Sequence, residues 1–127
     1  MGMHTELVLK CRLKNDLPPI VKSTLDFMLN PSHSEPSSEL PNHELFHCPR
    51  WEFMLVSNSF YHHPEKVVSR FNEYSSDYLF VRTDLKNYDD EIGKFIDWVK
   101  PYLENVEGEC IGWTWYEEEK SPTLIHI

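Results

Sequence analysis

The stretch from Asn87 to His126 constrains the fold most, because its hydrophobic period changes from helical to extended part-way along. In its first part apolar side chains recur every three or four residues, which predicts a helix with one face toward a core. These side chains are Ile92, Phe95, Ile96, Val99, Tyr102 and Leu103. Pro101 predicts a kink or a boundary, and Gly108 can end the helix. Residues 109–116 then alternate with a period of two, which predicts a strand.

The chain before this stretch opens with a strand and a helix. Residues 5–14 alternate, and their apolar side is expected to be buried; it consists of Leu7, Leu9, Cys11 and Leu13. Pro18 and Pro19 follow Asn15-Asp16, a typical helix start, and an apolar stripe then runs to Asn30. The first segments are therefore predicted to be strand, then helix.

The middle of the chain combines a long loop with further strands. Residues 31–49 are rich in Pro, Ser and His, which predicts a surface loop with one short helical turn near His43–Phe46. Residues 51–61 read as a strand that is central in the sheet, since residues 53–56 are apolar on both faces. Residues 66–74 and 78–86 predict a hairpin, and residues 123–127 a last strand.

The predicted order is β-α-β-β-β-α-β-β within one domain, residues 1–127. This order indicates an α+β fold with a single mostly antiparallel sheet and two helices packed on one face. Trp113 and Trp115 alternate with Gly112 and Thr114. If the smaller side chains lie under a helix, both tryptophans face the uncovered side, where they and Tyr61 are candidate binding residues.

Composition excludes several functional classes. The net charge of −9 disfavours contact with nucleic acid, because an acidic surface repels phosphates. The longest apolar run is four residues, 53–56, too short to span a membrane. The three cysteines, Cys11, Cys48 and Cys110, form no Cys-x-x-Cys pair, which favours a reducing, cytoplasmic location without disulfides.

One string matches a catalytic motif. His43-Glu44-Leu45-Phe46-His47 has the His-Glu-x-x-His spacing with which zinc hydrolases bind their metal, so His43 and His47 are candidate ligands. Pro41 and Pro49 leave under two helical turns between them, and no third ligand is identifiable, so exposed loop histidines are the favoured interpretation. No nucleophile signature or glycine-rich phosphate loop is present, and the sequence predicts neither a cofactor nor a catalytic residue.

The chain from about Pro41 onward carries short strings that occur together in a known group of proteins. They are Arg50-Trp51, Ser57 to Tyr61, Tyr88-Asp89, Glu91-Ile92, Trp98, Pro101-Tyr102, Gly108-Glu109, Tyr116-Glu117-Glu118 and Pro122-Thr123-Leu124-Ile125. On these residues the chain resembles a family of small uncharacterised bacterial proteins with no assigned activity. The resemblance implies a bacterial cytosolic origin and one compact domain, and it transfers no catalytic residue.

The sequence predicts a non-enzymatic domain that acts through protein contacts, with a partner or with a second copy of itself. Two alternatives stay open. One is a small-ligand-binding module with an aromatic-lined pocket, and the other is a zinc-dependent hydrolase centred on residues 43–47.

Overall fold

The computed structural model describes residues 3–32, 39–57 and 67–127 of the chain. Its strands are β1 (Thr5–Leu13), β2 (Val67–Glu73), β3 (Ser76–Leu85), β4 (Cys110–Tyr116) and β5 (Thr123–His126). Its helices are α1 (Pro19–Leu29) and α2 (Glu91–Val99), and the short 3₁₀ helices are η1 (Glu44–His47), η2 (Trp51–Phe53) and η3 (Lys100–Tyr102).

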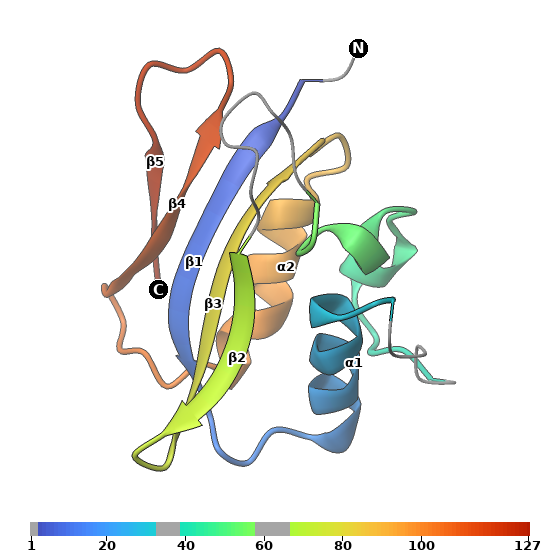
Figure 1. Ribbon diagram of the computed structural model, residues 1–127, viewed down its shortest axis with the longest axis vertical. Coiled ribbons are helices and arrows are strands. Elements are labelled where there is room, and N and C mark those ends of the chain that lie inside the picture. Colours follow the sequence, from blue (N-terminus) through green and yellow to red (C-terminus); the bar gives the residue numbers. More distant parts are fainter. Residues whose placement is uncertain (1–2, 33–38, 58–66) are drawn as a thin grey trace.

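The described strands form one sheet in the order β2-β3-β1-β4-β5, and each neighbouring pair is antiparallel. Figure 1 shows α1 and α2 on the same side of this sheet. The predicted α+β class, with an antiparallel sheet and two helices on one face, is therefore confirmed. We call the side of the sheet that carries the helices the inner face, and the opposite side the outer face.

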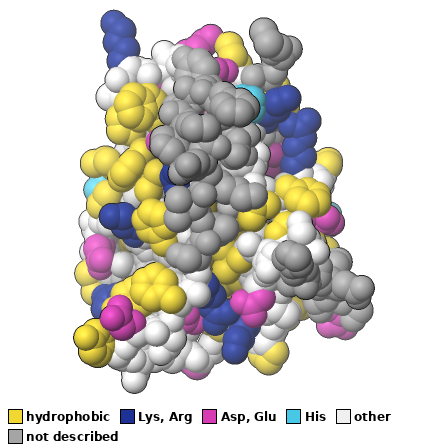
Figure 2. All heavy atoms as spheres, viewed as in Figure 1, with side chains coloured by type: hydrophobic (Ala, Val, Ile, Leu, Met, Phe, Trp, Pro, Cys, Tyr) yellow, Lys and Arg dark blue, Asp and Glu magenta, His cyan; other side chains and the backbone are white. Residues whose placement is uncertain are grey.

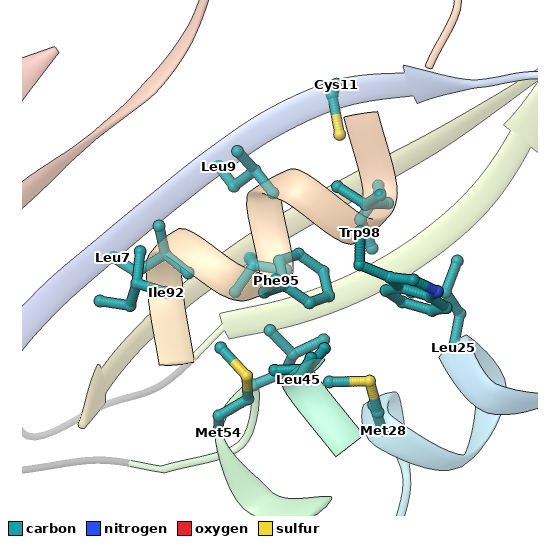
Figure 3. Close-up of a cluster of buried hydrophobic side chains, with 14 of the residues drawn as sticks. Leu7, Leu9, Cys11, Leu25, Met28, Leu45, Met54, Ile92, Phe95 and Trp98 are labelled. Atoms are coloured by element: carbon teal, nitrogen blue, oxygen red, sulfur yellow. The ribbon is translucent and has the colours of Figure 1, made fainter. Parts of the chain in front are cut away.

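The inward side chains of β1 form the middle of the core. Leu7, Leu9 and Leu13 are fully buried, and Cys11 is nearly so, as the alternation predicts. Figure 3 shows side chains from α1, α2 and residues 45–54 converging on the ring of Phe95, which is 0% exposed. The core thus lies between the inner face and a layer made of both helices and the η1–η2 segment.

The second helix ends where the sequence predicts a boundary. α2 stops at Val99, and Pro101 lies in η3, where a residue without a backbone N–H breaks no α-helical bond. Leu103 is buried and pairs with Leu13 of β1 through an isolated bridge. The apolar stripe of the sequence therefore continues past the helix into a segment that packs against the same core.

The predicted strand over residues 51–61 is wrong in the part that the structure describes. Residues 51–53 form η2, and residues 54–56 form a turn; residues 58–61 lie outside the described residues. Trp51, Met54 and Leu55 are buried, whereas Phe53 is 57% exposed. Buried positions separated by three and four residues fit a helical turn, so the uninterrupted apolar run concealed a helical rather than an extended pattern.

A bulge in β4 determines which of its residues face the core. The pairing of β4 with β5 shifts between Cys110 and Gly112. Simple alternation predicts that Ile111 points to the same face as the tryptophans, but at this shift Ile111 is buried in the core. A Cβ atom on Gly112 would lie 1.9 Å from the carbonyl oxygen of Val8. Only glycine fits so close to β1, and the strand beyond it resumes regular alternation.

Candidate functional site

The outer face carries Trp113 and Trp115, two of the three candidate binding residues predicted from the sequence. Trp113 pairs with Val8 and Trp115 with Glu6 of β1, and directly paired residues point to the same face of a sheet. Because Leu7 and Leu9 point inward, these neighbours point outward. The third candidate, Tyr61, lies outside the described residues.

Both indoles are held by hydrogen bonds. Trp113 Nε1 donates to Glu6 Oε1 at 3.3 Å, and the other oxygen of Glu6 accepts from Arg82 at 2.7 Å. The side chains of this ion pair are only 13% and 12% exposed, so the pair is poorly screened by solvent. Trp115 Nε1 donates to the carbonyl oxygen of Glu119 at 2.7 Å. The tryptophans are half-buried and fixed in orientation, which lowers the entropic cost of binding a partner.

A second aromatic group occupies the other end of the outer face, on β2 and β3. Phe71 stacks on Tyr78 with ring centroids 5.2 Å apart and an interplanar angle of 20°. Lys10 Nζ lies 5.9 Å from the ring centroid of Phe80. These four side chains and Arg12 line an open groove of about 420 Å³. The sequence placed these residues on strands but did not predict the groove, because it depends on the register of three strands.

Charges on the outer face nearly balance, in contrast to the chain as a whole. The cationic side chains are those of Lys10, Arg12 and Arg82, and the acidic ones that reach the surface are those of Glu6, Glu73 and Glu109. Asp84 points to the same face but is 0% exposed. Figure 2 shows hydrophobic and cationic side chains next to one another on the surface over the strands. An apolar surface without excess charge can approach another protein closely, even though the net charge of the chain is −9.

The carboxylate of Glu109 at the edge of this groove is held in its ionised form. Its oxygens accept hydrogen bonds from Asn105 Nδ2 at 2.7 Å and from the backbone N–H of Val106 at 3.2 Å. These two bonds, and then the nearby charge of Arg12, lower the pKa of Glu109. Arg12 and Glu109 therefore stay oppositely charged at neutral pH.

The His-Glu-x-x-His string folds differently from a zinc hydrolase motif. It forms η1, a 3₁₀ helix in which positions four residues apart point in different directions. His43 caps this helix: its Nδ1 accepts from the N–H of Leu45 at 3.0 Å, and its Nε2 lies 2.8 Å from Asp97 Oδ2. His47 is exposed. Within the three described ranges, no three His, Cys, Asp or Glu side chains are grouped so that they could hold a metal ion.

One buried acid was not predicted from the sequence. Glu91, the first residue of α2, has a side chain that is only 1% exposed. A usable signal was present, since Glu91, Phe95 and Trp98 are spaced as one helical stripe and all three are buried. The apolar stripe therefore contains a carboxyl group at its first position.

Comparisons of the chain with protein-family models, with curated proteins and with solved structures found no match. The resemblance to small bacterial proteins thus stays a prediction. In the described part of the chain, neither helix has the length and apolar character needed to cross a lipid bilayer.

Proposed function

We propose that this protein is a non-enzymatic, cytoplasmic interaction domain that pairs reversibly with a second copy of itself through the outer face. The observation that carries the proposal is the set of anchored, half-exposed aromatic side chains on a sheet face that neither helix covers. Aromatic residues, tryptophan and tyrosine above all, contribute most of the binding energy in protein interfaces. The three unpaired cysteines support a reducing compartment.

The charge distribution favours a second copy over other occupants. Two chains that each carry a net charge of −9 repel one another unless they meet where the charge is small. The outer face, with nearly balanced charges, is such a surface. The outer face carries both cations and acids. A two-fold axis between two copies can therefore place Lys10 or Arg12 of one copy near acids of the other.

The size of the face suggests the strength of the contact. Five strands of four to ten residues, about 4.8 Å apart, give a projected area on the order of 500 Å². This is close to the roughly 600 Å² per partner that separates transient from stable interfaces. We therefore expect a dimer in the micromolar range, formed and released readily.

Sedimentation velocity over a concentration series tests the proposal. Phe71 and Leu124 project from the outer face and are 46% and 56% exposed. Replacing either by lysine would place an unpaired charge in the interface and weaken the dimer by about tenfold or more. Phe53→Lys is the matched control, because Phe53 is equally exposed but belongs to η2 in the layer over the inner face.

The expected result is a monomer–dimer equilibrium that Phe71→Lys and Leu124→Lys shift toward monomer while Phe53→Lys leaves it unchanged. A chain that stays monomeric at the highest concentration contradicts the proposal. Equal weakening by all three substitutions also contradicts it, since the contact would then not be specific to the outer face.

A further inference from the structure

A cavity of about 660 Å³ lies between α2 and the β4–β5 hairpin, at the end of the sheet opposite β2 and α1 (Figure 1). Thr114 and Tyr116 reach it because they alternate with Trp113 and Trp115, and so point to the side of the sheet that carries the helices. Pockets of roughly 300–1,000 Å³ bind small molecules in other proteins. Several lining side chains are exposed, so a ligand can enter from solvent.

One end of the cavity is acidic. Asp90 lines it from the start of α2 and Glu119 from the turn after β4, and both side chains are exposed. Asp90 Oδ1 accepts a hydrogen bond from the N–H of Gly93 at 3.3 Å. Asp90 Oδ2 and the carboxylate of Glu119 form no hydrogen bond or ion pair within the described residues, and no lysine or arginine is among the lining residues. The cavity wall therefore leaves this negative charge unneutralised.

A buried hydroxyl at the same end lacks a partner. Thr5, the first residue of β1, is 8% exposed and lines the cavity, and its hydroxyl forms no hydrogen bond within the part of the chain that the structure describes. The oxygen is not sealed from solvent, so a ligand can reach it. Buried hydroxyls normally have a partner, because the lost hydration is costly. A group with several N–H donors could satisfy this hydroxyl together with the acids.

The surroundings of Tyr116 also favour a cation. Partial burial, then the charges of Glu118 and Glu117, and last the neighbouring Tyr88 raise the pKa of Tyr116. Tyr88 lines the cavity too, and tyrosine rings attract cations. Arg50, whose guanidinium carbon lies 5.4 Å from the ring centroid of Tyr88, does not line the cavity. Negative charge thus dominates this end.

The other end of the cavity is apolar. Ile96 of α2 and Ile125 of β5 line it, and both are half-buried. Ile125 pairs with Gly112, four residues before Tyr116 along β4, which at about 3.3 Å per residue is a distance of about 13 Å. The cavity therefore changes from acidic to apolar over the length of a short alkyl chain. The remaining lining residues are uncharged: Met3, Asn87, Ile92, Gly93 and Thr114.

We infer that this cavity binds a primary alkylammonium ion, with the ammonium group toward Asp90 and Glu119 and the alkyl chain against Ile96. A neutral alcohol would leave both acids without a counterion, and an anion would be repelled. A free amine and the side chain of a lysine share this chemistry. The polar peptide group of a lysine would follow its alkyl chain into the apolar end, which favours the free amine. The site lies on the opposite side of the sheet from the proposed dimer contact and is independent of it.

An NMR titration of the full chain at pH 7 with hexylamine tests the inference. We expect saturable shifts of the amide signals of residues 88–96 and 114–119. Butylamine, which is shorter by two methylene groups, should bind about tenfold more weakly. Hexan-1-ol and hexanoate, which lack the positive charge, should also bind about tenfold more weakly or worse. Nα-acetyl-lysine methylamide should bind more weakly than hexylamine.

Substitutions at the acidic end complete the design. Asp90→Asn and Glu119→Gln should each weaken hexylamine binding by about threefold, and the double variant by about tenfold. Asn caps a helix as well as Asp does, so Asp90→Asn leaves the start of α2 intact. Glu107→Gln, an exposed acid outside the cavity, is the matched control and should not change the affinity. Phe71→Lys on the outer face should also leave the titration unchanged.

Four results would overturn the inference. The first is the absence of saturable shifts at these residues with hexylamine. The second is equal binding of hexan-1-ol or hexanoate, and the third is an unchanged hexylamine affinity in the double variant. The fourth is a lysine derivative that binds as tightly as hexylamine, since the cavity would then receive a side chain of another protein.

Discussion

The two faces of β1 differ in composition although they belong to the same nine residues. The inner face is aliphatic and sealed, with Leu7, Leu9 and Leu13 at 0% exposure. The outer face carries Glu6, Lys10 and Arg12, with aromatic neighbours on the adjoining strands. The inner face can contribute only to stability, whereas the outer face combines aromatic area with charges that orient it, which is the composition of a recognition surface.

The largest expected effect tests the inner face. Phe95→Ala removes a fully buried ring from the centre of the core and should lower the free energy of unfolding by about 3–5 kcal/mol. Phe71→Ala on the outer face removes a ring that is 46% exposed and should cost about 1 kcal/mol or less in the monomer. Urea unfolding followed by circular dichroism measures both, and similar losses would remove the distinction between the faces.

The next effect concerns the glycine that sets the outward direction of the tryptophans. Gly112→Ala places a Cβ against the Val8 carbonyl and should cost about 3 kcal/mol, the upper part of the range for overpacking. Gly108→Ala is the control: Gly108 has a φ of +88° but open space around it, so only the backbone penalty of about 1 kcal/mol applies. Thermal unfolding should rank the two variants in this order, and a reversed order would show that β4 does not need close contact with β1.

The smallest expected effect concerns the reactivity and ionisation of two cysteines. Cys11 points inward and Cys110 is exposed, and burial raises the pKa of the Cys11 thiol to about 12. At pH 8 a disulfide reagent should modify Cys110 at least about a hundredfold faster than Cys11. The pKa of Cys11 in the folded state lies above its ordinary value near 9.0, so folding favours the neutral thiol. The contribution of this thiol to the free energy of unfolding is therefore fully present below pH 9 and declines as the pH rises toward 12. Rapid labelling of Cys11 in the native state would contradict its position on the inner face.

The sequence predicted the elements whose hydrophobic period is unambiguous. β1, α1, the β2–β3 hairpin, α2 with its boundary at Pro101, β4 and β5 all follow from alternation, helical stripes or proline chemistry. Residues 51–56 were misassigned because four consecutive apolar residues fit a buried strand and a buried helical turn equally well. Tertiary packing of Trp51, Met54 and Leu55 against the helices decided between them.

The candidate sites were less predictable than the fold, because they depend on register and on local irregularity. The outward direction of Trp113 and Trp115 could be predicted from Gly112, but the inward position of Ile111 required the bulge. The groove near Phe71, Tyr78 and Phe80 arises only when β2, β3 and β1 are aligned. No sequence pattern specifies that alignment in advance.

An NMR dilution series that follows the four tryptophan indole N–H signals tests the central claim most directly. Trp113 and Trp115 lie on the outer face, and Trp51 and Trp98 are buried in the core. If two copies pair through the outer face, the signals of Trp113 and Trp115 shift with protein concentration while those of Trp51 and Trp98 do not. Concentration-independent signals from all four indoles, or shifts confined to Trp51 and Trp98, would contradict the account.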